Sequence, residues 1–206
     1  MKKGAGSKVI EIPAPDMRWL EVDVEGTSPL LVSQFTQKAK QQIREAQSGA
    51  PKTRKRPPRL PEQEFQDSRY RHPGGGDGFP SAAFKKAMVS ACRLVDGLTM
   101  TQAWILFRVL GTHDVELVKL KCSEPVMDER AVRQADGGMN LRYRALYQKW
   151  STRLRIRYSA DAISAEQLLH LLHRAGESIG VGELRPEHGG NLGCFEIGKA
   201  GRATKK

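Results

Sequence analysis

The sequence predicts an α+β fold in which an antiparallel β-sheet is covered by two helices. Residues 19–25 and 152–158 each alternate apolar and charged side chains, which is the pattern of a half-buried strand. Residues 81–95 and 166–175 place apolar side chains at helical spacing, so each indicates an amphipathic helix. The rest of the prediction is built on these four segments.

The two alternating strands carry opposite charges. If they are neighbours in the sheet, the charges pair across it. The alternative is that the arginine face is a platform for nucleic acid, and we favour the pairing. The acidic residues are Glu21, Asp23 and Glu25, and the arginines are Arg153, Arg155 and Arg157.

Capping signals and shorter segments complete the element order. Ser81 follows Pro80 and has a side chain typical of a helix N-cap, and Ser164 with Gln167 forms a capping-box pattern. The other expected elements are a short helix at 62–70, a helix or a strand at 101–110, a strand at 113–122 that contains a bulge or is buried on both faces, and a closing strand at 193–197.

Residues 47–60 form a basic, proline-rich insertion. Pro57 and Pro58 prevent regular structure there. We expect a mobile arm that follows a phosphate backbone, because each neutralised phosphate releases a counterion. A solvated linker is the alternative. The residues assigned to nucleic acid in this arm are Lys52, Arg54, Lys55 and Arg56.

A second insertion, at residues 123–150, shows no convincing period. Arg142 and Arg144 lie among tyrosines, a combination that can pair guanidinium groups with phosphates and stack aromatic rings on bases. The alternative is a lid whose aromatic side chains pack on the core. We assign the two arginines to nucleic acid, and Tyr147 and Trp150 to the core.

Residues 179–197 contain five glycines around a polar segment between the second helix and the last strand. Glycine tolerates positive φ and lets a backbone or ligand approach closely, so the segment predicts a loop whose N–H groups face an anion. A helix cap followed by a wide turn is the alternative. The position of the segment, with Arg185 at its centre and basic insertions elsewhere, favours a loop that grips phosphate.

The composition indicates a single domain with an anionic partner. The 206 residues can bury one core, and 34 Lys and Arg against 23 Asp and Glu give a net charge of +11. The three cysteines have no paired spacing, which argues against disulfides and a zinc knuckle. No apolar segment has the length of a signal or a membrane span, so we expect a cytoplasmic protein. The expected parts are a flexible leader at 1–16, a domain at 17–198 with insertions at about 33–78 and 123–150, and a basic tail at 199–206.

Without its insertions, the expected order is βαββαβ, the ferredoxin-like or RRM-like arrangement. This order, with GVGELRPEHGGNLGCFEI at 180–197 and GTSPLL at 26–31, resembles the RAMP superfamily of CRISPR-associated RNA-binding proteins. The similarity is to small phage or prophage forms of the backbone subunit that coats guide RNA.

The resemblance implies single-stranded RNA binding within a homo-oligomer, without a cofactor, and contacts with other CRISPR-type subunits. Single-stranded DNA is the alternative ligand. The loop residues that the resemblance nominates are Gly180, Gly182, Arg185, Gly189, Gly190 and Asn191. Position and charge add Ser28, Lys85, Lys86, Arg142 and Arg144.

Two other functions stay open. Some RAMP relatives are metal-independent endoribonucleases, and His72 is the only histidine between the first strand and Ser81, which makes it the candidate acid or base for RNA cleavage. A phage protein that mimics a CRISPR subunit is the other possibility. His170 and His173 lie three residues apart without an evident third ligand, so no metal site is expected. We favour a non-catalytic binding protein.

Overall fold

The larger of two β-sheets forms the body of the molecule. The computed structural model describes residues 13–35, 40–41, 43–44, 47–48, 59–112, 115–133 and 137–198. The neighbouring strands of the larger sheet are, in order, β3 (Gly78–Pro80), β5 (Leu117–Cys122), β8 (Trp150–Ser159), β1 (Met17–Gly26) and β9 (Phe195–Ile197), and β4 (Phe107–Leu110) also pairs with β8. Every pairing is antiparallel.

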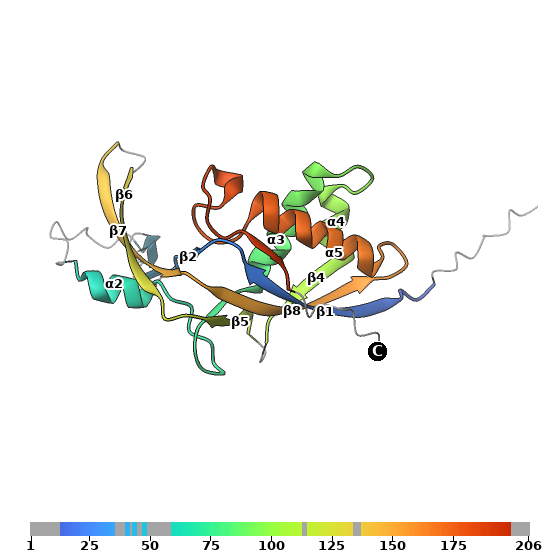
Figure 1. Cartoon of the computed structure of the whole chain (residues 1–206), viewed down its shortest axis with the longest axis horizontal. Helices are drawn as coiled ribbons and strands as arrows, with labels where there is room; N and C mark the ends of the chain where they lie inside the picture. Colours follow the sequence, from blue (N-terminus) through green and yellow to red (C-terminus); the bar gives the residue numbers. More distant parts are fainter. Residues whose placement is uncertain are drawn as a thin grey trace, which may run out of the picture.

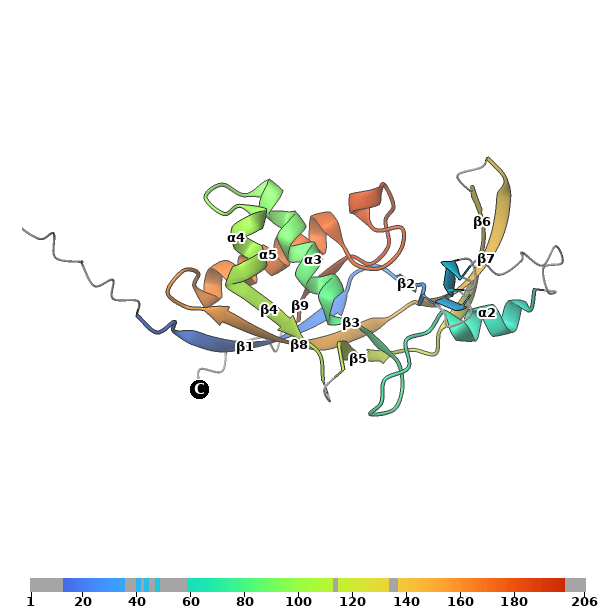
Figure 2. The same cartoon turned by 180° about the vertical axis from the view of Figure 1, so that it is seen from behind.

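Three helices cover one face of this sheet and leave the other face open (Figures 1 and 2). They are α3 (Ser81–Ala91), α4 (Met100–Leu106) and α5 (Ala165–Arg174). Apolar side chains of β1, β8 and these helices are buried between the two layers, with Phe84, Ile156 and Leu168 among the fully buried ones. The molecule therefore has the predicted α+β class with antiparallel sheets.

The pairing of opposite charges between β1 and β8 is confirmed. Glu21 lies opposite Arg155, and Asp23 lies opposite Arg153. The Arg153 guanidinium Nε is 2.7 Å from Asp23 Oδ1, and Arg155 Nε is 3.3 Å from Glu21 Oε1. Alternation in the sequence was sufficient to predict both strands and the pairing of their charged faces, and the structure adds the register.

A smaller sheet lies at one end of the molecule. Its order is β2 (Leu30–Val32), β7 (Met139–Tyr147) and β6 (Val126–Arg133), and α2 (Pro61–Asp67) lies beside it (Figure 1). The β6–β7 hairpin bends toward the helix side of the larger sheet. The segment 123–150, in which the sequence showed no convincing period, contains this hairpin, and most of the hairpin is exposed on both faces and so shows no apolar alternation. Tyr147 and Trp150 are buried, as predicted.

Other expected elements are confirmed with small corrections. The ambiguous segment 101–110 forms both α4 and β4, and the capping box at Ser164 is present. Ser81 is not the N-cap of α3, because Pro80 holds that position and the Ser81 hydroxyl donates to the Glu116 carbonyl instead. Short 3-10 turns lie at Cys92–Leu94 and Pro186–His188, and a π-turn lies at Ala175–Ile179.

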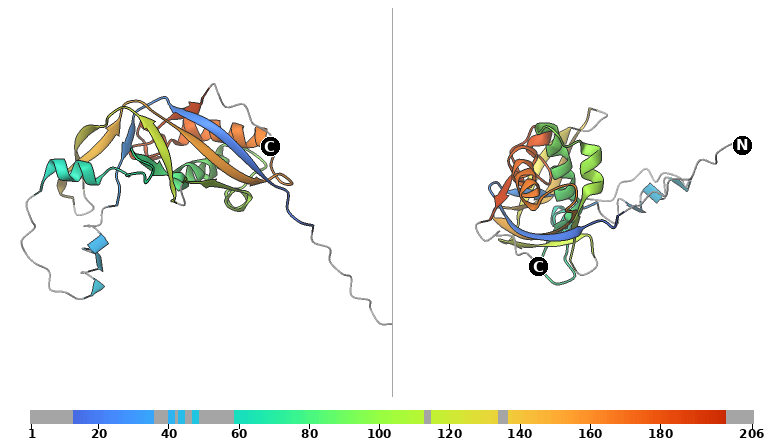
Figure 3. Two further views of the ribbon diagram at one scale, coloured as in Figure 1. Left: turned by 90° about the horizontal axis from the view of Figure 1, so that it is seen from below. Right: turned by 90° about the vertical axis from the view of Figure 1, so that its right-hand side faces the viewer.

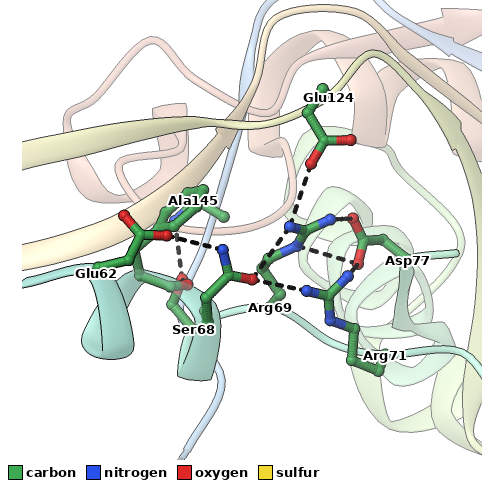
Figure 4. A network of polar contacts seen from close by, with 9 residues as sticks. Glu62, Ser68, Arg69, Arg71, Asp77, Glu124 and Ala145 are labelled. Atoms are coloured by element: carbon green, nitrogen blue, oxygen red, sulfur yellow. Dashed lines mark hydrogen bonds and ion pairs between the residues drawn. The ribbon is translucent and has the colours of Figure 1, made fainter.

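A buried ion-pair network fixes the segment that leads from α2 to α3 (Figure 4). Asp77 accepts from Arg69 at 2.7 Å and from Arg71 at 3.2 Å, and Arg69 also lies 3.3 Å from Glu124. The Ser68 hydroxyl accepts the N–H of Ala145 on β7 at 2.9 Å. These contacts attach α2 to the base of the hairpin, so the hairpin has a fixed origin on the body.

Three predicted parts lie outside the described residues. They are the leader up to residue 12, most of the basic arm and the tail from residue 199. Within the described part of the chain, no helix is long and apolar enough to cross a membrane.

Candidate nucleic-acid interface

The glycine-rich loop connects α5 to β9 and folds back on its own backbone. A Cβ atom at Gly190 would lie 1.8 Å from the Leu184 carbonyl oxygen, and one at Gly193 would lie 1.7 Å from the Val181 carbonyl oxygen. Both contacts are impossible, so only glycine fits. The glycines therefore permit close packing of the loop.

Several N–H groups of the loop point into the protein. Those of Val181 and Leu192 donate to carbonyls within the loop, whereas that of Glu183 donates to Leu31 and that of Gly193 to Pro29. The Ser28 hydroxyl, which we nominated for RNA, accepts the N–H of Cys194 at 2.9 Å. Ser28 thus has a structural role in anchoring the loop, and these amides are not the expected anion cradle.

A groove of about 400 Å³ lies between the loop, α3 and β2. One wall is the first part of the loop, Gly180–Glu183, with Arg185 and Glu187. The opposite wall is the first turns of α3, including Ala82, Ala83 and Lys86, with Tyr70 and Phe79 beside it. The groove brings together Gly180, Gly182, Arg185 and Lys86, which the sequence nominated from two distant segments.

The N-terminus of α3 opens into this groove. Among the described residues no side chain caps it, and the Ser81 hydroxyl that could have done so is bonded to Glu116. The first N–H groups of a helix carry partial positive charge and attract anions. Lys86, one turn further on, is exposed and adds a full positive charge to the same wall.

Arg185 belongs to a cluster of two arginines around one carboxylate. Glu187 pairs with Arg185 at 2.9 Å and with Arg93 at 2.7 Å. Burial alone would raise the pKa of Glu187, but hydrogen bonds with Ser90 and Arg185 outweigh it and lower the pKa. Glu187 is therefore ionised at neutral pH, and the cluster keeps one net positive charge. Arg93, in the 3-10 turn that follows α3, was not among the residues nominated from the sequence.

Lys85 and Lys86 point to different neighbours, although both were nominated. The Lys85 ammonium donates to the Trp104 carbonyl at 2.9 Å and lies 4.8 Å from the centre of the Trp104 ring. Burial, and then the charge of Arg108, lower the pKa of Lys85. Lys85 thus holds α4 against α3, and only Lys86 reaches the groove.

The face of the β6–β7 hairpin that carries Arg144 continues from the loop. Arg144 is buried and lies 3.5 Å from Asp128 and 3.6 Å from Glu183 of the loop. One register step further out on the same face, Arg142 lies directly opposite Arg130. Arg130 pairs with Asp128, whereas Arg142 is exposed and makes no ion pair with any described residue. Arg142 is thus accessible to a ligand in solution, whereas Arg144 links the hairpin to the loop inside the protein.

The remaining nominated residues lie away from the groove or outside the description. Gly189 and Asn191 are exposed at the far end of the loop, and the Gly190 N–H donates to the Arg185 carbonyl. The four basic residues of the arm, Lys52, Arg54, Lys55 and Arg56, lie outside the described residues.

His72 is buried and both of its ring nitrogens are hydrogen-bonded. The Gly74 N–H donates to Nδ1 at 3.0 Å, so Nε2 carries the proton and donates to the Thr112 hydroxyl at 2.6 Å. With an exposed fraction of 4%, the imidazole is out of reach of a substrate. His72 therefore has a structural role here, and its geometry gives no support to RNA cleavage. No cluster of metal-binding side chains occurs in the described ranges.

Comparison with known proteins places the fold. Neither a protein-family model nor a curated protein matches the sequence. A chain of the Type III-B Cmr-beta bound to cognate target RNA, solved by cryo-EM, has a TM-score of 0.50 and 15% identity, over 89% of this chain and 59% of that chain. The crystal structure of Cmr6 from Pyrococcus furiosus has a TM-score of 0.44 and 8% identity, over 89% of this chain and 99% of that chain.

The present chain spans less than two thirds of the length of the Cmr-beta chain that it matches. At this level of identity the similarity concerns the fold. The protein shares its fold with this chain of the Type III-B Cmr-beta structure.

Proposed function

We propose that the protein binds single-stranded nucleic acid, RNA in preference to DNA, and that it does so without catalysing a reaction on it. The observation that carries the proposal is the groove between the glycine-rich loop and the uncapped N-terminus of α3, with Lys86 and Arg185 on its two walls. Arg142 and Arg130 extend the positive charge along the hairpin. A backbone of phosphates can follow this path from helix to loop to hairpin.

The fold supports an assembly of several subunits. We propose that the order β1, α3, β4 with β5, β8, α5, β9 is a βαββαβ arrangement with two insertions, the first ending at β3 and the second forming the hairpin. The structural neighbour is part of a complex bound to target RNA. We propose that this chain is likewise a repeating subunit of a CRISPR-like ribonucleoprotein, of a cellular or phage-encoded kind, in the cytoplasm.

Fluorescence anisotropy with labelled single-stranded oligonucleotides, titrated at several salt concentrations, tests the proposal. Lys86→Ala removes a charge from the groove, so we expect weaker binding and a salt dependence reduced by about 0.7 in the slope of log K against log salt. Arg174→Ala, an equal charge change at the exposed end of α5, is the control and keeps the wild-type affinity. Equal affinities of wild type and Lys86→Ala would remove the groove from the binding site.

A further inference from the structure

The open face of the larger sheet carries a row of three side chains that the proposed groove does not use. Arg108 of β4 lies opposite Arg157 of β8, and Arg157 lies opposite Trp19 of β1. Directly opposed residues of antiparallel strands project from the same face, and the three are exposed while their chain neighbours Val109, Ile156 and Leu20 are buried. Figure 3 (left) shows this face toward the viewer, with the helices behind it.

Within the described ranges, the row has no acidic partner. Further along the same face, Arg153 pairs with Asp23 and Arg155 with Glu21. Arg108 and Arg157 make no ion pair with any residue that the structure describes. Like charges directly opposite each other in a sheet destabilise it, so this arrangement is unfavourable in the isolated molecule. A bound anion would remove the repulsion.

Trp19 adds an aromatic surface at the end of the row. Its side chain is 46% exposed, although tryptophan usually buries most of its surface. The guanidinium of Arg155 lies 5.0 Å from the ring centre and that of Arg157 lies 5.9 Å from it. Each arginine thus lies within cation–π distance of the ring, which positions the guanidinium groups beside an exposed aromatic platform.

From this geometry we infer a second binding site for single-stranded nucleic acid on the open face, formed by Trp19, Arg157 and Arg108. A base stacks on Trp19, and the adjacent phosphates lie against Arg157 and Arg108. The alternating aromatic and cationic chemistry fits a polynucleotide, which offers both a flat base and a phosphate at each step. An acidic protein segment would satisfy the arginines and leave the ring unstacked.

The site is independent of the groove, because the two lie on opposite sides of the larger sheet. Its existence does not require the proposed function to hold at the groove. A variant of either site reports on that site alone, so a failure of one proposal is distinguishable from a failure of the other.

The test is a stoichiometric titration with an oligonucleotide of about eight nucleotides, in the range of sites that one small domain covers. We expect two oligonucleotides per protein chain for the wild type and one for Trp19→Ala. Arg157→Gln weakens binding at the open face and lowers the salt slope of that binding event, here called the second, by about 0.7. Lys86→Ala weakens binding at the groove, the first event, and keeps the second. Loss of the stacked ring corresponds to about a 5- to 150-fold change in affinity at that site.

Arg153→Gln is the matched control, since it removes the same charge from the same strand and face but from a residue already paired with Asp23. It retains both binding events. Circular dichroism confirms that each variant is folded. Two oligonucleotides per Trp19→Ala chain, or one per wild-type chain that Trp19→Ala binds with unchanged affinity, would overturn the inference. One oligonucleotide per wild-type chain that Trp19→Ala no longer binds would instead overturn the groove alone. Displacement of the second oligonucleotide by poly-glutamate, with unchanged affinity in Trp19→Ala, would instead assign the face to an acidic protein and also overturn it.

Discussion

Gly182 and Gly189 show how two glycines in one loop differ in what they require. Gly182 has a φ of 81°, and a Cβ atom there would lie 2.6 Å from the Leu31 carbonyl oxygen. Gly189 has a similar φ of 76°, but a Cβ atom there would meet nothing within 4 Å. Gly182 is therefore constrained by both conformation and space, and Gly189 by conformation alone.

This difference predicts unequal losses of stability. Gly189→Ala should lower the free energy of unfolding by about 1 kcal/mol, the penalty of a left-handed backbone for alanine. Gly182→Ala should lower it by about 3 kcal/mol, because β2 must also move. Urea unfolding followed by circular dichroism measures both. Equal losses would mean that the Leu31 contact does not constrain the loop.

At the scale of the element, the β6–β7 hairpin separates two arginines that look equivalent in the sequence. Arg144 is buried between Asp128 and Glu183, whereas Arg142 is exposed. Arg144→Ala should lower the free energy of unfolding by about 3 kcal/mol, because it breaks a buried pair. Arg142→Ala should change it by no more than about 0.5 kcal/mol.

The variant with the smaller expected effect on stability, Arg142→Ala, is the one expected to affect oligonucleotide binding directly. Arg142→Ala should weaken oligonucleotide binding with the fold intact, as measured by anisotropy beside thermal unfolding. The matched exposed control is Lys149→Ala, at the turn between β7 and β8. An Arg142→Ala protein with wild-type affinity would restrict the interface to the groove.

At the scale of the whole molecule, ion pairs between distant segments make stability depend on pH. The hydrogen bond from Arg153 lowers the pKa of Asp23, and Glu187 also has a lowered pKa. A carboxyl whose folded pKa lies below its unfolded value stabilises the protein above the unfolded pKa, about 3.9 for Asp and 4.3 for Glu. This stability is lost as the pH falls through the folded pKa.

We therefore expect the free energy of unfolding to be nearly constant above about pH 5 and to fall below about pH 4. Asp23→Asn should make that decline shallower. Glu25→Gln, on the same strand and without an ion pair in the described part of the chain, should leave it unchanged. Urea midpoints across this pH range measure the effect, and identical profiles for Asp23→Asn and wild type would contradict it.

Local pattern was enough to predict much of the fold. The alternation in β1 and β8 fixed their faces and their partner charges, and helical spacing with a capping box at Ser164 located α3 and α5. Local pattern did not predict the β6–β7 hairpin, because a hairpin that projects into solvent has no buried face and therefore no alternation of apolar and polar residues. The prediction of Ser81 as the N-cap of α3 was also wrong, because the Ser81 hydroxyl donates to the carbonyl of Glu116 on a distant segment.

The sequence by itself determined the charge of this protein, its α+β class, the position of the glycine-rich loop and its order between α5 and β9. These follow from composition, periodicity and the backbone freedom of glycine, which are all local. Only the tertiary structure decided that Lys86 faces the groove while Lys85 holds Trp104, that Arg144 is internal, and that Arg108, Arg157 and Trp19 share one row. The direction and neighbours of a side chain depend on which segments pack together, and that is set by contacts between residues far apart in the chain.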